Sequence, residues 1–290
     1  MSILHDFEYY NPRNIEEVLQ LRAEYRDKTR ILAGGTDLVV QMKDNIIAPD
    51  VVIDIKGIEA FHEITFDENI LFIGACITFS ELIESEIIQR YFPLIKEMSL
   101  TVASMGIRNR ATMIGNICSA VPSADSAPIL LVYDADVIVR SASKDRIVPI
   151  TEWFAGPKKT TLKSDEIVTG IALHFPERKH AGCYERLGRY SGEDLAQAGI
   201  CILAFDDDQY HVACCAVGPI PKRLYHIEEF LNGKVIDQNV IQEAKQIMLN
   251  NIFPISDVRA SKEYREHMMG IMLERGLMKA VSRLHGGENA

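Results

Sequence analysis

Two separated stretches of short residues constrain this chain more than any other feature. Residues 104–128, SMGIRNRATMIGNICSAVPSADSAP, are mostly small, hydroxylated or glycine residues, and residues 30–38, RILAGGTDL, have the same character. Short side chains leave backbone N–H groups able to approach a bulky anion closely. We therefore predict that the two stretches form one divided site for a phosphate-bearing cofactor.

Length and charge exclude several classes of protein. A chain of 290 residues exceeds one ordinary hydrophobic core, which predicts two or three subdomains. A formal net charge of −10 argues against nucleic acid or an anionic membrane surface as a partner. The acidic, proline-containing amino terminus is unlike a signal peptide, and no apolar run approaches the ~20 residues of a spanning helix. We expect a cytoplasmic protein without a membrane segment.

Side chains for catalysis or metal binding form no recognisable pattern. The six cysteines are scattered through apolar segments without a C-x-x-C pair, so buried free thiols explain them better than iron–sulfur or zinc ligation. His174 and His180 share neither a helix face nor a strand face. Without a nucleophile elbow or a paired set of carboxylates, we assign no catalytic residue and no metal ligand.

The first stretch follows a predicted helix and strand. Asn14 and Glu17 match a capping box that opens a helix over residues 15–25. A buried strand over residues 29–33 then ends at Gly34-Gly35, and Thr36 can cap a helix over residues 39–42. This order places free N–H groups beside a helix start, which suits a phosphate. A plain tight turn at the glycine pair is the alternative, because neither G-x-G-x-x-G nor a P-loop is present.

The second stretch lies within an α+β pattern. Thr112 and Asn116 flank Gly115 and offer short hydrogen-bonding side chains. Asp125 opens a predicted helix and is either a helix-terminal acid or an acceptor for sugar hydroxyls. Arg108 and Arg110 fit a solvated face or a partner contact better than phosphate ligands. The surrounding pattern predicts strands over residues 51–55, 70–75, 136–141, 146–150 and 166–174, and helices over residues 78–83, 87–98 and 126–133.

Beyond residue 176 the pattern changes to antiparallel strands followed by helices. The strands are predicted over residues 183–187, 200–205 and 210–217, and the helices over residues 223–231, 239–249 and 261–284. In the last helix a stripe rich in methionine is predicted to be core rather than a cofactor contact. Its members are Tyr264, Met268, Ile271, Met272 and Leu277.

The two stretches together carry a family resemblance. ILAGGTDLV paired with GIRNRATMIGNICSAVPSADSAP resembles the FAD-binding flavoprotein (medium) subunit of the xanthine dehydrogenase and carbon monoxide dehydrogenase family of molybdenum hydroxylases. YERLGR at residues 184–189 and RASKEYR at residues 259–265 support it. The resemblance covers nearly the whole chain, and its motifs are specific in combination.

The resemblance implies an α+β fold of the vanillyl-alcohol-oxidase (PCMH) type. Residues 1–58 and 59–176 would be two α/β subdomains that enclose FAD, and residues 177–290 a carboxyl-terminal subdomain of antiparallel sheet and helices. The first motif would wrap the diphosphate and the second would add further contacts, with Asp125 near the adenosine ribose. The implied cofactor-binding residues are Ile31, Leu32, Ala33, Gly34, Gly35, Thr36, Asp37, Leu38, Ala111, Thr112, Gly115, Asn116 and Asp125, with Ala103, Ile167, Val168 and Arg186 or Arg189 near the flavin end.

Two positions qualify the resemblance. Ile114 stands where the family usually has glycine, so a positive φ at this position would strain a β-branched residue. Thr36-Asp37 stand where covalent flavoproteins of the wider superfamily often carry histidine, which implies a dissociable FAD. For Gly35→Val we expect a clash with the diphosphate and release of FAD with folding nearly intact.

The function implied is electron transfer within an oxidoreductase complex. A molybdopterin subunit would hydroxylate the substrate, and an iron–sulfur subunit would relay electrons through 2Fe-2S clusters. FAD on this chain would collect the electrons for NAD(P) or another acceptor. Two alternatives are a free-standing FAD-dependent oxidoreductase, for which Tyr190 is the available side chain, and a non-catalytic flavin-binding scaffold.

Overall fold

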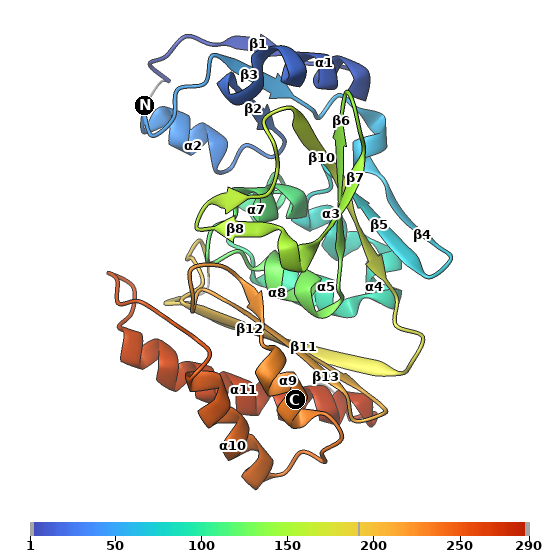
Figure 1. Ribbon diagram of the computed structural model, residues 1–290, viewed down its shortest axis with the longest axis vertical. Coiled ribbons are helices and arrows are strands. Elements are labelled where there is room, and N and C mark those ends of the chain that lie inside the picture. The colour runs from blue at the N-terminus through green and yellow to red at the C-terminus, as the bar shows by residue number, and fades with distance from the viewer. Residues whose placement is uncertain (1–2, 191, 288–290) are drawn as a thin grey trace.

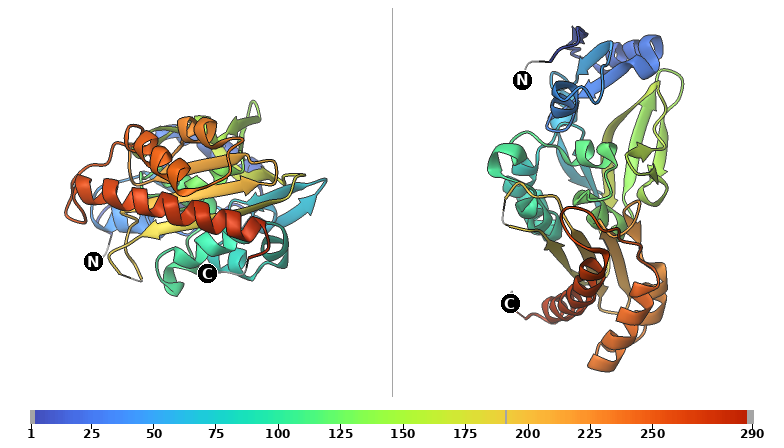
Figure 2. Two further views of the ribbon diagram at one scale, coloured as in Figure 1. Left: turned by 90° about the horizontal axis from the view of Figure 1, so that it is seen from below. Right: turned by 90° about the vertical axis from the view of Figure 1, so that its left-hand side faces the viewer.

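Three sheets follow one another along the long axis of the molecule (Figure 1). The computed structural model describes residues 3–190 and 192–287. The amino-terminal segment forms one end, the antiparallel sheet of the carboxyl-terminal part lies toward the other, and a larger sheet with several helices lies between them (Figures 1 and 2).

The first sheet has three parallel strands in the order β1-β3-β2. Its central strand is fully buried, as expected for a strand with neighbours on both sides. Asn14 accepts a hydrogen bond from the Glu17 amide and caps the first helix as predicted. The elements are β1 (Glu8–Tyr10), α1 (Ile15–Tyr25), η1 (Arg26–Lys28), β2 (Thr29–Leu32), α2 (Leu38–Lys43) and β3 (Val51–Asp54).

The second sheet has five antiparallel strands in the order β4-β5-β10-β6-β7. A small hairpin of β8 and β9 and several short helices accompany it. The elements are η2 (Glu59–His62), β4 (Ile64–Asp67), β5 (Ile70–Gly74), α3 (Phe79–Glu84), α4 (Glu86–Tyr91), α5 (Pro93–Thr101), α6 (Met105–Arg108), α7 (Met113–Ser119), α8 (Ser126–Val132), β6 (Asp136–Ser141), β7 (Arg146–Pro149), η3 (Ile150–Glu152), β8 (Phe154–Gly156), β9 (Lys159–Thr160) and β10 (Glu166–His174).

A buried arginine fixes the first sheet's layer against the second. Arg22 on α1 donates from Nε to the Glu166 carbonyl oxygen at 3.0 Å and from Nη2 to the Lys163 carbonyl oxygen at 3.1 Å. Its Nη1 also donates to the Thr29 hydroxyl at 2.5 Å. Because Glu166 and Lys163 lie 144 and 141 positions from Arg22, these two bonds hold the amino-terminal layer against the start of β10.

The third sheet joins two hydrophobic cores. Every residue of β12 is buried, and alternate side chains point to opposite faces of a strand. Cys201 and Leu203 belong to the core shared with the first two layers, whereas Ile200 and Ile202 face the core under α11. The elements are β11 (His180–Leu187), β12 (Ala198–Phe205), β13 (Tyr210–Cys215), β14 (Lys222–Arg223), α9 (Tyr225–Leu231), α10 (Gln238–Leu249) and α11 (Lys262–Leu284). The long helix α11 runs across β11 and β12 (Figure 2).

Three expectations about the elements need correction. The helix expected over residues 87–98 is two helices, α4 and α5, because Pro93 occupies the first position of α5 and cannot continue α4. Thr36 does not cap α2, since Asp37 occupies the N-cap position and its side chain makes no capping bond. The predicted stripe on α11 is only partly core: Met272 and Leu277 are buried, but Tyr264 is 46% exposed.

Within the described residues, no helix combines the length and the apolar character needed to cross a membrane.

Candidate functional site

The two motif stretches meet through their backbones. An atom in the Cβ position of Gly34 would lie 2.0 Å from the Arg110 carbonyl oxygen and 3.0 Å from the Ala111 Cα. Such approaches are far below van der Waals contact, so only glycine fits at this position. The structure therefore brings residues separated by more than 70 positions into direct contact, as the divided site requires.

The turn before α2 presents backbone donors. The N–H groups of Gly34, Gly35, Thr36 and Asp37 donate no hydrogen bond to any residue that the structure describes. Gly35 has a φ of +75°, a left-handed conformation that favours glycine and turns the chain into α2. Consecutive unused N–H groups at a turn are typical of an anion-binding concavity. Such a concavity fits the diphosphate of a dinucleotide.

The same geometry corrects the expectation for Gly35→Val. A Cβ at position 35 would lie 2.8 Å from Leu32 Cδ1 and 3.3 Å from Val39 Cγ2, on a backbone that side chains rarely adopt. The substitution would strain the free protein as well as a bound ligand. Loss of FAD with folding nearly intact is therefore not the expected outcome for this variant.

The second motif forms the short helix α7. Thr112 is its N-cap, and its hydroxyl accepts a hydrogen bond from the Gly115 amide at 2.9 Å. Asn116 accepts from the Ser126 amide at 3.2 Å and so connects α7 to the start of α8. Ile114 is buried in α7 and is absent from the described residues with positive φ, so the β-branched side chain causes no backbone strain there.

A side-chain contact also joins the two motifs. The Ser119 hydroxyl donates to Asp37 Oδ2 at 2.5 Å, from the end of α7 to the start of α2. Nothing in the sequence singled out Ser119, which is one of several small residues in its stretch.

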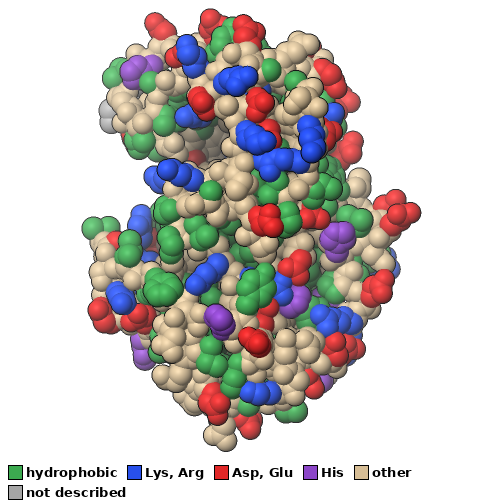
Figure 3. Space-filling model, in the orientation of Figure 1, with side chains coloured by type: hydrophobic (Ala, Val, Ile, Leu, Met, Phe, Trp, Pro, Cys, Tyr) green, Lys and Arg blue, Asp and Glu red, His purple; other side chains and the backbone are tan. Residues whose placement is uncertain are grey.

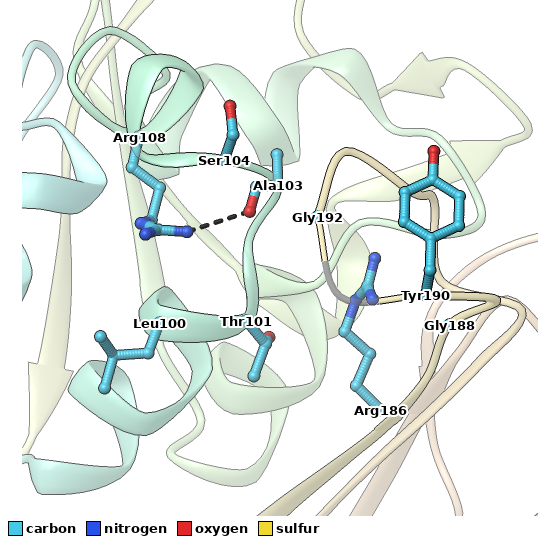
Figure 4. A pocket seen from close by; sticks show the side chains of 9 residues that line it. All are labelled: Leu100, Thr101, Ala103, Ser104, Arg108, Arg186, Gly188, Tyr190 and Gly192. Atoms are coloured by element: carbon cyan, nitrogen blue, oxygen red, sulfur yellow. Dashed lines mark hydrogen bonds between the residues drawn. The ribbon is translucent and has the colours of Figure 1, made fainter.

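A cavity of about 450 Å³ lies between the second and third layers (Figure 4). One wall comes from the end of α5 and from α6, and the other comes from β11 and the loop that follows it. Ala103 and Arg186, both predicted to lie at the flavin end, line this same cavity. The full set of lining residues is Leu100, Thr101, Ala103, Ser104, Arg108, Arg186, Gly188, Tyr190 and Gly192.

A buried ion pair holds Arg186 at the cavity. Arg186 Nε donates to Asp125 Oδ1 at 3.1 Å, and the Tyr184 hydroxyl donates to the same oxygen at 2.7 Å. Asp125 is 8% exposed, and burial raises the pKa of its carboxyl group, while Arg186 and Tyr184 act in the opposite direction. Arg186 also donates from Nη2 to the Asp194 carbonyl oxygen. These contacts fix the guanidinium group on the cavity wall.

Arg108 is a cavity residue that the sequence interpretation placed elsewhere. Its Nη1 donates to the Val102 carbonyl oxygen at 2.9 Å. It also donates to the Ala103 carbonyl oxygen at 3.0 Å, the contact drawn in Figure 4. Ala103 has a φ of +40°, which is strained for a residue with a side chain. The expectation of a solvated face is therefore wrong for Arg108, which holds a strained turn in the wall, whereas the expected partner contact stays a prediction. Across the cavity, the Ser104 hydroxyl donates to Glu193 Oε1.

A second cavity, of about 440 Å³, adjoins the contact between the two motifs. Ala33, Gly34 and Thr112 line it together with residues of both signs of charge. Figure 3 shows the surface hollowed between the amino-terminal lobe and the layer below it, with Lys or Arg side chains at the edge. The remaining lining residues are Lys56, His62, Cys76, Thr78, Ser80, Glu81, Glu84, Asn109 and Arg110.

Ile167 and Val168 lie apart from both cavities. They are buried in β10, next to a bulge between Val168 and Gly170, and neither is among the cavity-lining residues. Arg189, the alternative to Arg186, donates its amide to Asp194 Oδ2 at 2.5 Å, and its side chain does not line the cavity.

The site offers placement rather than acid–base chemistry. Among the described residues, no group of three or more His, Cys, Asp or Glu side chains is arranged to hold a metal ion. All six cysteines are free, and burial raises the pKa of the Cys76 and Cys118 thiols to about 12. Protonated thiols of this kind are poor nucleophiles. What the residues can do is bind an anion through the backbone and place a cation beside a cavity.

Comparison with known proteins shows the family of the chain. Residues 5–176 match the FAD binding domain in molybdopterin dehydrogenase, and residues 183–280 match the CO dehydrogenase flavoprotein C-terminal domain. Together these matches define a class, the FAD-binding chains of molybdopterin-dependent oxidoreductases.

Individual relatives extend over the full length. The xanthine dehydrogenase FAD-binding subunit of Escherichia coli O157:H7 is 30% identical over 286 residues, with 96% of this chain and 97% of that protein covered. The carbon monoxide dehydrogenase medium chain of Hydrogenophaga pseudoflava is 28% identical over 281 residues, with 96% and 98% covered. A solved structure of carbon monoxide dehydrogenase from that organism superimposes with a TM-score of 0.93 over 98% of this chain and 99% of that one, at 28% identity.

This chain belongs to the family of FAD-binding subunits of molybdenum hydroxylases, with xanthine and carbon monoxide dehydrogenase subunits among its relatives. The predicted family, its FAD cofactor and its α+β fold are thereby confirmed.

Proposed function

We propose that this chain is the electron-transfer subunit of a multi-subunit molybdenum hydroxylase. It takes electrons from 2Fe-2S clusters on a partner iron–sulfur subunit and passes them to NAD(P) or another acceptor. The substrate is oxidised on a separate molybdopterin subunit. Relatives called medium chain or FAD-binding subunit support this division of labour.

One observation carries the proposal. The backbone contact between Gly34 and Arg110 brings four unused N–H groups of the first motif beside the second motif, within a molecule that also holds an arginine-lined cavity. Backbone donors suit a diphosphate, and a cavity of a few hundred cubic ångströms suits a ring system.

The residues would divide the work along the cofactor. Residues 31–38 and the second-motif residues Ala111, Thr112, Gly115 and Asn116 would surround the diphosphate. Ala103 and Arg186 would face the flavin end, where a fixed positive charge favours added negative charge on the ring. When bound, FAD supplies the ability to accept and release one or two electrons. Ile167 and Val168, which lie apart from this cavity in β10, would take no part in lining it.

Asp125 would act at the same end as Arg186. The two side chains bond directly, so we propose that the carboxylate orients the guanidinium group rather than binding the adenosine ribose.

The layers suggest how the parts of the chain contribute. The three-stranded, five-stranded and four-stranded sheets fall within residues 1–58, 59–176 and 177–290, respectively. We propose that the first two segments enclose a dissociable FAD and that the third closes the flavin end. Six free thiols suit a reducing compartment, so the cytoplasm is the proposed location.

The test is isolation of the chain from its native source without dissociating its partners. Co-migration with iron–sulfur and molybdenum-containing chains, a flavin absorption spectrum and reduction of NAD(P) or a dye by an oxidisable substrate would support the proposal. A lone yellow protein that reduces a small substrate by itself would favour a free-standing oxidoreductase instead. A colourless protein that copurifies with neither cofactor nor partners would refute the electron-transfer role.

A further inference from the structure

A buried arginine on the carboxyl-terminal helix bonds to the ends of two strands of the third sheet. Arg265, in the first turn of α11, is 4% exposed. Its Nη1 donates to the carbonyl oxygens of Gln197 at 2.8 Å and Ala216 at 3.2 Å, and its Nη2 donates to Asp257 Oδ1 at 2.7 Å. One guanidinium group therefore joins the ends of two neighbouring strands to the segment before α11.

Gln197 and Ala216, whose carbonyl groups accept from Arg265, each donate a backbone hydrogen bond to a segment next to the buried ion pair. The Gln197 amide donates to the Leu187 carbonyl oxygen at 2.8 Å, which closes the β11–β12 hairpin below the loop that lines the cavity. The Ala216 amide donates to the Pro122 carbonyl oxygen at 2.6 Å. Leu187 directly follows Arg186, and Pro122 lies three residues before Asp125. Arg265 is thus connected to both members of the buried ion pair.

The local geometry has features that stability alone does not explain. Ala216 has a φ of +62°, an unfavourable conformation for a residue with a side chain. Within the described chain, Nε of Arg265 has no hydrogen-bond partner although it is buried. An unmet buried donor costs stability, and an apolar side chain often stabilises such a position better than an ion pair does.

We propose that Arg265 is a positioning residue that sets the distance and orientation of Asp125 relative to Arg186. By holding Gln197 and Ala216 at fixed positions, Arg265 keeps the segments at Leu187 and Pro122 in fixed positions relative to each other. The guanidinium group of Arg186, next to Leu187, is thereby held on the cavity wall. The inference rests on the proposed function, because it is at the flavin end that the orientation of Arg186 acts.

The experiment compares variants of the full chain by two independent measurements. The first is the dissociation constant for FAD, from titration of the apoprotein, and the second is hydrogen exchange of the Gln197 and Ala216 amides without FAD. Arg265→Met should weaken FAD binding roughly tenfold and speed exchange at both amides. Asp257→Asn is the matched control, because it removes the ion pair but leaves both carbonyl contacts, and it should change FAD binding by less than about twofold.

A double variant tests whether Arg265 acts through Arg186. Arg186→Met combined with Arg265→Met should bind FAD no more weakly than Arg186→Met alone, since the positioned group is already missing. Arg265→Lys, whose amine ends one bond short of the Nη1 position that contacts both carbonyl oxygens, serves in place of Arg265→Met if the latter fails to fold.

The outcomes separate the two proposals. A lower melting temperature with unchanged FAD affinity and unchanged amide exchange would reduce Arg265 to an ordinary structural residue. Fully additive losses in the double variant would also overturn the inference. If the unaltered protein binds no FAD, the proposed function fails. Exchange at Gln197 and Ala216 would still decide the role of Arg265: faster exchange in the variant supports it, and unchanged exchange refutes it.

Discussion

The two halves of the candidate site are built in different ways. Where the first and second motifs meet, the closest approach is between backbones: Gly34 lies against the Arg110 carbonyl group, and the donors offered are N–H groups. At the cavity, long side chains define the walls, with Arg108 bonded to the Ala103 turn and Arg186 to Asp125. The first half depends on the absence of side chains, whereas the second depends on particular ones.

This difference predicts different responses to mutation. A backbone contact is broken when a side-chain atom is added, because the two loops must then move apart, and ligand binding is weakened as a result. A side-chain contact fails when one partner is removed, and the damage is largest where the other partner is left charged and buried. The two halves can therefore be separated by four substitutions, taken below in order of expected effect.

Arg186→Met should have the largest effect on stability. It leaves the Asp125 carboxylate buried, with the Tyr184 hydroxyl still donating to it, and breaking a buried pair costs about 3–5 kcal/mol. Burial already raises the pKa of Asp125, and loss of Arg186 raises it further. A carboxyl group with a raised pKa favours folding when protonated, so the variant should lose stability as pH rises above about 4.

Urea denaturation between pH 4 and pH 8 measures this effect. The control is Arg186→Met with Asp125→Asn, which removes the buried charge and should flatten the pH dependence. An equally steep decline in the double variant would show that Asp125 is not the group responsible.

Gly34→Ala should be next, and its effect should fall mainly on FAD. The added methyl group would lie 2.0 Å from the Arg110 carbonyl oxygen, so the two motifs must separate. Overpacking of this kind lowers stability by about 1–3 kcal/mol. Because the N–H groups of the first motif are moved away from the second motif, FAD should bind roughly a hundredfold more weakly.

Gly156→Ala is the matched control for this substitution. Its added Cβ meets no atom within 4 Å, and its backbone does not have a positive φ, so FAD affinity and melting temperature should be unchanged. Full FAD content in Gly34→Ala would refute the assignment of the first motif to the diphosphate.

Arg108→Met should produce a smaller loss. It removes two hydrogen bonds to the Val102 and Ala103 carbonyl oxygens, worth about 1–2 kcal/mol together in this half-exposed setting. The released turn should relax from its left-handed conformation, which would be visible as a changed flavin absorption spectrum. Arg140→Met, on an exposed hairpin, controls for loss of a positive charge. Identical spectra for the two variants would exclude Arg108 from the flavin end.

The contrast between the halves also explains what the sequence could predict. Gly34, Gly35 and the small residues around Thr112 share one physical property, the absence of bulk, and this property is visible along the chain. The buried strands were equally visible as apolar runs bounded by glycine and proline. Contact between two stretches more than 70 residues apart could be inferred because both were suited to the same ligand.

The cavity walls could not be predicted in this way. Sequence alone does not distinguish a solvated arginine from one that bonds a strained turn, and for this reason the turn contacts of Arg108 are not predictable from the sequence. The Asp125–Arg186 pair joins residues 61 positions apart. The Arg265 contacts depend on how strand ends and helix starts meet in space, which periodicity does not encode. Side-chain sites built from single distant residues need the fold before they can be recognised.

Ser119→Ala should have the smallest effect and tests the side-chain contact that joins the two motifs. The Ser119 hydroxyl holds the Asp37 carboxylate at the end of α7, and Asp37 is the one acidic residue of the first motif. Without that bond the carboxylate is free to turn toward the N–H groups and to repel a diphosphate. FAD affinity should fall roughly threefold, with little change in melting temperature because both groups are at the surface. Adding Asp37→Asn to Ser119→Ala removes the negative charge and should restore the affinity for FAD, as measured by titration at low ionic strength. A further loss of affinity in the double variant would mean that Asp37 contributes to FAD binding rather than opposing it.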